Sequence, residues 1–401
     1  MRRVEIHAWL FGDGGDAFLK GALYGSFVFF LLILNRWLVT DLGLLSFGRV
    51  WQYYVSYADI GFVRRALLGS ALSYSKLNTL IKNEYIFTLV FSSVCGAFSY
   101  VLTYRIMRHG VFTRAFVLSV AFSPAFLLHF GYANGSLDLP VLVVALGAIL
   151  FIDNLSVVSG LVVIGILIHE VFVFLIPTIL VLRWDARVRE ASAPRGRKDL
   201  VSFVAIAVAS IGTYAALKHF GVAYFDRNEY YHLMAQRIPN AAYKIGLWSG
   251  YCELFSPLSD NIVDVPGYVR NNINSFAGVL SLLTVIYAVH LTCLCAWKNQ
   301  KFDGFGKSLV IGAALFPLLI MLVATDFLRW ASFSGTAALL ALVTFVKKGY
   351  VTVRPFHNYI MLGFCTLSPF GMIDMGYPFP IVFFIWNKAL RLLTKYWLVP
   401  A

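Results

Sequence analysis

The sequence predicts an all-α, polytopic integral membrane protein with roughly ten to twelve membrane segments. Hydrophobic residues make up 59% of the 401-residue chain and charged residues only 13%, which leaves too little polar surface for a water-soluble fold. Several apolar runs reach the ~20 residues that a helix needs to cross the hydrocarbon core. Because no internal repeat or low-complexity stretch divides the chain, we interpret residues 1–401 as a single membrane domain.

Basic residues at the ends of alternate apolar runs give the expected orientation. The chain begins with Met1-Arg2-Arg3, and the positive-inside rule therefore places the N-terminus in the cytoplasm. Residues 35–84 then form the first outer loop. Within this loop we expect an amphipathic helix on the membrane surface, with an apolar stripe formed by Ile60, Val63, Leu67 and Ala71. The first four spans are expected at about 21–38, 85–102, 117–130 and 141–152.

The apolar stretch 155–182 is expected to be a short helical hairpin. A single straight span there would carry Arg183 and a cluster of further basic residues to the outer face, against the positive-inside rule. A hairpin with His169-Glu170 at its outer tip removes this conflict. Each arm would extend ~20 Å at 1.5 Å per residue, less than the ~30 Å hydrocarbon thickness. The tip would therefore lie in a protein-lined, re-entrant position.

The C-terminal half continues the alternation. It contains one long outer loop, residues 218–274, rich in aromatic and polar side chains, and it ends in a cytoplasmic amphipathic tail at 387–401. A span at about 200–217 leads into this loop, and between the loop and the tail we expect further spans at about 276–297, 309–325 and 331–345 and an apolar part from about 359.

Composition also limits the partners and the compartment. The net charge of +13 belongs to residues that flank apolar runs, so we expect membrane lipids and no nucleic acid as partners. The five cysteines show neither a disulfide framework nor metal-ligand spacing, so we expect no metal centre built from cysteine. The N-terminal stretch lacks the apolar core of a cleaved signal peptide.

The expected topology gathers ionisable residues from distant segments at the outer face. His169 and Glu170 give the strongest signal, because ionisable residues in an apolar run are unfavourable unless they are paired. The candidate catalytic residues are Asp59, His169 and Glu170, and the further candidates on this face are Arg64, Arg65, Asp138, Asp326 and Arg329.

These residues also have purely structural interpretations. Asp59 is a candidate cap for the surface helix, and Asp138 is a candidate helix start. Arg64 and Arg65 are suited to anchoring in anionic lipid. Asp326 and Arg329 have the i,i+3 spacing of a helix salt bridge.

A set of acids, arginines and an imidazole on one face fits group transfer at a phosphorylated sugar. A carboxylate accepts the proton of an acceptor hydroxyl, while arginines hold a phosphate leaving group and offset its charge. Aromatic side chains of residues 218–274 are candidates for contacts with sugar faces or with lipid headgroups. A divalent cation held by these acids and the histidine is a further option, although no ligand spacing is recognisable.

Four short motifs carry a resemblance to known enzymes: Asp59 after the first span, Asn134-Gly135-Ser136-Leu137-Asp138, Ile168-His169-Glu170 and Asp326-Phe327-Leu328-Arg329-Trp330. With them the chain resembles polytopic glycosyltransferases of the GT-C type and Wzy-type polysaccharide (O-antigen) polymerases. The resemblance implies a polyprenyl-linked sugar donor, a lipid-linked acceptor and Asp59 as the base. The likeness to the polymerases adds Arg237 and Arg270 of the long loop as substrate-binding candidates.

The chain also departs from these families. It has no Asp-x-Asp in the first loop, no Trp-Trp-Asp signature and no large soluble C-terminal domain, which argues against protein glycosylation. We therefore expect an enzyme of the bacterial inner membrane that joins sugars or oligosaccharide repeats from undecaprenyl-type (di)phosphate carriers on the periplasmic face. O-antigen, lipopolysaccharide and capsule assembly are processes of this kind. The alternatives are a GT-C monosaccharide transferase that modifies a lipid or glycan, and a lipid-linked-oligosaccharide flippase or secondary transporter.

Overall fold

The computed structural model places most of the chain. It describes residues 3–34, 50–81, 83–132, 136–190, 197–220, 226–238, 251, 254–255, 276–297, 302, 304–322, 327–367, 369–370 and 379–380. Most of the long loop 218–274, with Arg270, lies outside this part of the chain, as do Asp326 and the tail 387–401.

Helices dominate the described residues, and three of them are long and apolar enough to cross a membrane: α2 (Gly15–Leu34), α6 (Glu84–Met107) and α18 (Phe327–Lys347). Shorter apolar stretches lie in α9 (Asp138–Leu150), α10 (Leu155–Ile168), α12 (Arg197–Phe220), α16 (Phe276–Trp297) and α17 (Gly304–Leu315). The expected helical, multi-pass membrane class is thereby confirmed. The described residues also include one antiparallel pair of two-residue strands, β1 (Pro369–Phe370) and β2 (Phe379–Pro380), which contact α8 and α19 respectively.

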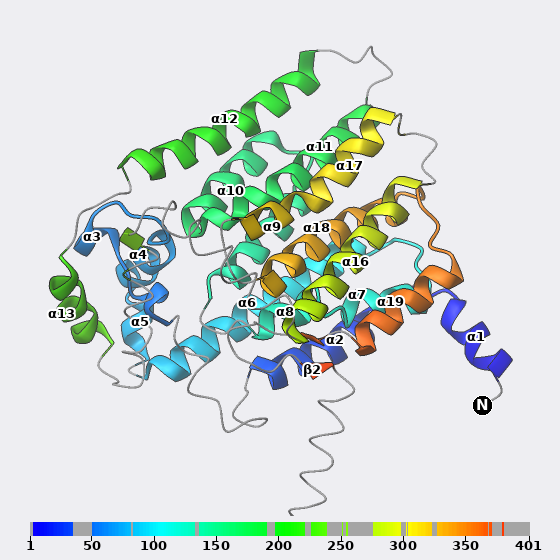
Figure 1. The fold of residues 1–401 in the computed structure, drawn as a ribbon, viewed down its shortest axis with the longest axis horizontal. Coiled ribbons are helices and arrows are strands. Elements are labelled where there is room, and N and C mark those ends of the chain that lie inside the picture. Colours follow the sequence, from blue (N-terminus) through cyan, green and yellow to red (C-terminus); the bar gives the residue numbers. More distant parts are fainter. Residues whose placement is uncertain are drawn as a thin grey trace, which may run out of the picture.

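Helix α18 forms the centre of the bundle, packed against α16, α17, α6, α11 (Ile176–Glu190) and the 3-10 helix η6 (Phe316–Leu322) (Figure 1). Residues 329–343 of this helix are all buried, as expected of a helix that is surrounded by others. Small residues let its neighbours approach closely, since a Cβ added at Gly335 would lie 2.7 Å from the Cβ of Ala125. Helix α6 instead exposes Val90, Val94 and Val101, as expected of a helix that faces lipid.

The two ends of the bundle differ in charge. Helices α6 and α18 finish at the same end, because the Lys347 ammonium donates a 2.6 Å hydrogen bond to the carbonyl of Ile106. We call this end of the bundle the basic end, defined by Arg105, Arg108, Lys347 and Lys348. Helix α18 begins at the opposite end, where the candidate site lies.

The expected single amphipathic helix after the first span is not observed. Residues 50–80 instead form four short helices: η3 (Val50–Tyr53), α3 (Tyr57–Ile60), α4 (Leu67–Tyr74) and α5 (Leu77–Leu80). Two residues with positive φ, Gly61 (76°) and Arg65 (65°), interrupt the path of the chain between α3 and α4. The segment folds back on itself, because Gly69 packs directly on the Val55 carbonyl and is buried, whereas Ala71 is exposed.

The chain reverses direction at His169. Helix α10 ends at Ile168, His169 is extended (φ −158°), and η4 (Glu170–Leu175) leads into α11. The reversal is packed tightly, since a Cβ on Gly165 would collide with the ring of Phe172. Helix α11 then returns to the level at which α10 begins, because the buried guanidinium of Arg183 donates to the carbonyl of Ile152, just before α10.

The expected span at 117–130 is divided into two helices, α7 (Arg114–Ala121) and α8 (Leu127–Tyr132). Pro124 lies in the break and supplies no backbone N–H. The Ser123 hydroxyl accepts the N–H of Ala125 and supports the turn. The remaining described helices are α1 (Arg3–Phe11), α13 (Arg227–Arg237) and α19 (Pro355–Leu367).

Candidate functional site

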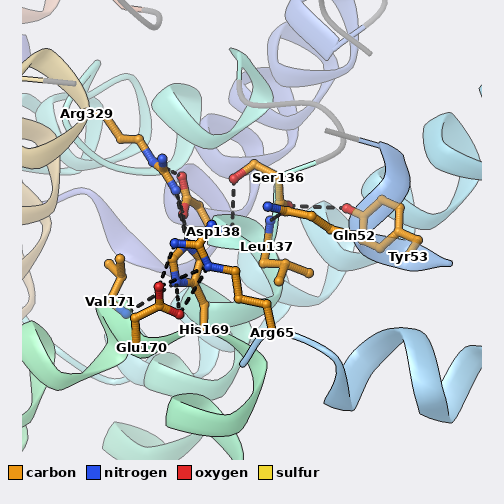
Figure 2. Close-up of polar contacts among 10 residues, drawn as sticks. All are labelled: Gln52, Tyr53, Arg65, Ser136, Leu137, Asp138, His169, Glu170, Val171 and Arg329. Carbon is orange, nitrogen blue, oxygen red and sulfur yellow. Dashed lines mark hydrogen bonds and ion pairs between the residues drawn. The ribbon is translucent and has the colours of Figure 1, made fainter. Parts of the chain in front are cut away.

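Five ionisable side chains from four separate parts of the fold meet at the end of the bundle opposite the basic end (Figure 2). We call this set the buried charge network. An imidazole lies at its middle, with a carboxylate and guanidinium pair on either side. The members are Arg65, Asp138, His169, Glu170 and Arg329.

The inner half of the network is the pair of Asp138 and Arg329. Asp138 is the first residue of α9, and Arg329 lies in the first turn of α18. The guanidinium donates from Nε to Oδ2 and from Nη2 to Oδ1, each at 2.5 Å, which is the bidentate geometry of a strong charge-assisted pair. The Asp138 side chain is fully buried and that of Arg329 is 5% exposed, so each charge depends on the other.

The first loop holds the start of α9 in place. The Gln52 side chain in η3 accepts the backbone N–H of Leu137 at 3.2 Å, and the Tyr53 hydroxyl donates to the carbonyl of Ser136 at 3.2 Å (Figure 2). The backbone N–H of Asp138 in turn donates to the Ser136 hydroxyl. These contacts fix the backbone from which the Asp138 carboxylate reaches Arg329.

The outer half is the pair of Glu170 and Arg65. The Arg65 Nε lies 3.0 Å and 3.1 Å from the two carboxylate oxygens, and its Nη2 lies 2.5 Å from Oε1. The side chains are 22% exposed at Glu170 and 14% at Arg65, so the network reaches the surface on this side. Arg65 adopts the left-handed conformation, which a residue other than glycine rarely takes, between α3 and α4.

His169 connects the two pairs. Its Nδ1 lies 3.2 Å from a Glu170 oxygen, and its Nε2 lies 3.3 Å from an Arg329 nitrogen. The neutral tautomer with its proton on Nδ1 satisfies both neighbours, because it donates to the carboxylate and accepts from the guanidinium. The backbone N–H of Val171 lies 3.3 Å from Nδ1 and can donate to it only in the other tautomer, in which Nδ1 carries no proton. With a neutral imidazole the two arginines and two acids balance in charge.

Asp59 and Arg237 form a second pair, between α3 and α13. The Arg237 guanidinium donates to Asp59 Oδ1 at 2.6 Å and to the Ser73 hydroxyl at 2.9 Å. Within the described part of the chain, the other carboxylate oxygen of Asp59 is buried without a hydrogen-bond partner. Arg64 donates to the carbonyl of Leu254 at 3.3 Å, so it also contacts the long loop. Asp59 and Arg65 are close in the chain, since Asp59 lies in α3 and Arg65 lies in the short segment that joins α3 to α4.

The structure thus brings five of the ten expected residues into one network and places Asp59 and Arg237 together in another pair. Ser56 caps α3, so capping does not explain Asp59. Arg329 pairs with Asp138 across the bundle, and Arg270 and Asp326 lie outside the described residues.

Gln52, Tyr53 and Ser73 also position the site, although none of them was among the expected site residues. Gln52 carried a signal that could have been used, because it is a lone amide within the aromatic run Trp51-Gln52-Tyr53-Tyr54. It is 1% exposed, and such a residue is rarely buried without a structural task. Ser73 carried no such signal.

Neither metal ligands among the described residues nor similarity to known proteins assigns a function to the site. Among the described residues, no group of three or more His, Cys, Asp and Glu side chains is arranged to hold a metal ion. No protein family, curated protein or solved structure matches the chain. The functional argument therefore depends on the site itself.

Proposed function

We propose that this protein is a membrane glycosyltransferase or polymerase that acts on polyprenyl-(di)phosphate-linked sugars at the end of the bundle that holds the buried charge network. The observation that carries the proposal is the network itself. Ionisable groups buried among apolar helices commonly mark a functional site. Stability alone does not account for them, because apolar residues of similar volume often stabilise a core as well as a buried ion pair.

Arg65 and Arg64 are the proposed contacts for the carrier phosphate. The Arg65 guanidinium lies at the accessible end of the network, and its planar set of donors suits a phosphate as well as a carboxylate. A phosphate oxygen that takes one of these donors replaces a Glu170 oxygen in the same position. Glu170 then keeps its contact with the His169 ring. Before the carrier binds, Glu170 would thus keep the Arg65 guanidinium in position for a phosphate. After its displacement, the Glu170 carboxylate would remain in contact with His169.

Asp59 is the proposed base. Its Oδ1 is held by Arg237, while its Oδ2 is buried and has no partner among the described residues, so a bound acceptor hydroxyl that reaches this oxygen would meet an unused proton acceptor. In the proposed step the acceptor hydroxyl gives its proton to this oxygen, and the hydroxyl oxygen bonds to the anomeric carbon of the donor sugar. The bond from that carbon to the phosphate oxygen breaks, and the (di)phosphate leaves with the electron pair.

The proposal includes the setting expected from the sequence. The ten to twelve segments would place the site at the periplasmic face of a bacterial inner membrane. The donor and acceptor would be lipid-linked, as in O-antigen, lipopolysaccharide or capsule assembly. A single-sugar transfer to a lipid or glycan would use the same site, and the length of the product glycan distinguishes it from polymerisation.

The test is Asp59→Asn in purified protein reconstituted with lipid-linked oligosaccharide. Loss of a general base commonly lowers the rate by about 10²- to 10⁴-fold, and we expect a loss in this range. Asp16→Asn is the matched control, because Asp16 is an exposed aspartate in α2 that contacts Lys20 and Tyr104. A folded Asp59→Asn protein that elongates the substrate at the full rate refutes Asp59 as the base.

A second candidate function follows from the broken helix. Transporters often place charged groups where a membrane helix is interrupted, and His169 lies at such a break between α10 and η4. A lipid-linked-oligosaccharide transporter would move its substrate between the leaflets of a proteoliposome and form no new glycosidic bond. Measuring translocation and product in the same vesicles separates the two functions.

A further inference from the structure

A cavity of about 260 Å³ opens between α16 and α19 at the basic end of the bundle. The rings of Tyr287 in α16 and Phe364 in α19 stack, with their centroids 3.7 Å apart. Five side chains that bear on its chemistry line the cavity: His290, Cys293, Thr352, Arg354 and His357. It is distinct from the buried charge network, because Arg329 and Lys347, which mark the two ends of α18, are separated by ~27 Å at 1.5 Å per residue.

The lining of the cavity is basic. His357 Nδ1 lies 3.3 Å from His290 Nε2, so these two imidazoles share one hydrogen bond across the interface of the helices. Arg354 adds a permanent positive charge, and Thr352 adds a hydroxyl. None of the described residues that line the cavity is acidic. This chemistry favours an anion.

A metal ion fits the cavity less well. His290, Cys293 and His357 are residue types that bind zinc, but they are not grouped as a set of three ligands in the described structure. A guanidinium in the same lining also repels a cation.

An exposed apolar stripe on α16 leads to the cavity. Leu282, Ile286 and Val289 follow one another at helical spacing and are 58%, 54% and 39% exposed. Trp297, which is 78% exposed, stands at the rim. Tryptophan commonly lies at the level of lipid headgroups. The cavity volume is slightly below the ~300 to 1,000 Å³ of small-molecule sites, which suits a headgroup whose chains remain outside.

We infer that this cavity binds the phosphate headgroup of an anionic lipid, with the acyl chains lying along the exposed stripe of α16. Arg354 and His357 donate to the phosphate oxygens, and His290 supports His357 from the facing helix. The site is independent of the proposed transferase activity, since it uses none of the same residues and lies at the other end of the bundle.

The wild-type protein offers a direct test through Cys293, which is exposed and lines the cavity. Delipidated protein in neutral detergent is treated with a maleimide in the presence of phosphatidylglycerol, phosphatidylcholine or inorganic phosphate. Mass spectrometry of the digested protein then reports modification at Cys293 alone. We expect phosphatidylglycerol to slow the modification about tenfold, and the other two to have little effect. Equal protection by phosphatidylcholine, or full protection by inorganic phosphate, refutes an anionic-lipid site.

Two variants test the residues. The double variant Arg354→Gln/His357→Gln should lose this protection and retain about tenfold less phosphatidylglycerol in native mass spectrometry. Lys348→Gln is the matched control, because Lys348 belongs to the basic end but does not line the cavity, and it should retain the lipid. Thr352→Phe fills the cavity and leaves its charges, so it should also exclude the lipid. Unchanged lipid retention in folded Thr352→Phe and in the double variant overturns the proposal.

Discussion

Removal of one partner of the Asp138 and Arg329 pair should destabilise the protein strongly, whereas removal of both should not. The single variants Asp138→Leu and Arg329→Met each leave one charge buried in the bundle, since the two side chains are 0% and 5% exposed. Breaking a buried pair in this way commonly lowers the free energy of unfolding by about 3 to 5 kcal/mol. That is a large part of the ~5 to 15 kcal/mol by which proteins are stable.

The double variant Asp138→Leu/Arg329→Met replaces both charges by apolar groups of similar length. Such replacements are often neutral, so we expect at least half of the single-variant loss to be recovered and a coupling energy of at least about 2 kcal/mol. Equilibrium unfolding of the purified protein in mixed micelles measures all four members of this cycle. The neighbour His169, which contacts Arg329, remains present throughout.

The matched control is the exposed pair of Lys20 and Asp16 on α2, at 2.8 Å. Its variants should leave the unfolding curve nearly unchanged, because water solvates both charges. The reasoning is refuted if Asp138→Leu destabilises no more than Asp16→Asn, or if the double variant loses the sum of the two single losses. In either case the pair would not be energetically coupled.

Four further substitutions have expected outcomes. Gly165→Ala should lower the free energy of unfolding by about 1 to 3 kcal/mol, because its Cβ meets the Phe172 ring. Gly160→Ala in the same helix meets nothing within 4 Å, and in thermal unfolding it should be neutral or stabilising. Arg65→Lys keeps the charge but loses the planar fork, so the proposed transferase activity should fall at least tenfold while the unfolding curve changes little. Gln52→Leu removes the acceptor for the Leu137 N–H and should destabilise by about 1 to 3 kcal/mol in the same unfolding assay; no measurable loss would contradict the role of Gln52 in holding α9.

The helical, multi-pass class followed from composition, because the apolar content leaves few other folds available. The break in α10 lies beside the one pair of ionisable residues in that apolar run, His169 and Glu170, which carried a clear signal. Periodicity was a poorer guide after the first span. It indicated one amphipathic helix, but the left-handed Arg65 and the packing of Gly69 on Val55 override that pattern.

The pairing inside the site could not be predicted from the sequence. Local spacing favoured a salt bridge between Asp326 and Arg329, but Arg329 reaches Asp138, 191 positions away in the chain. Nothing in the sequence of α9 or α18 encodes that distance, because it arises from how the helices between them pack. In the same way, the contact between Asp59 and Arg237 depends on where α13 docks.

The long separation of Asp138 and Arg329 also has a consequence for biogenesis. During synthesis α9 is made well before α18. About 190 further residues are therefore added before Arg329, the counter-ion of Asp138, is present. An early insertion intermediate therefore lacks the guanidinium partner of this acid, although His169, whose Nε2 lies 4.0 Å from Asp138 Oδ1, has already been made. We expect the helices to become stably packed only after α18 has been made and Arg329 has paired with Asp138. Nascent chains that are arrested before α18 should therefore be degraded by quality-control proteases.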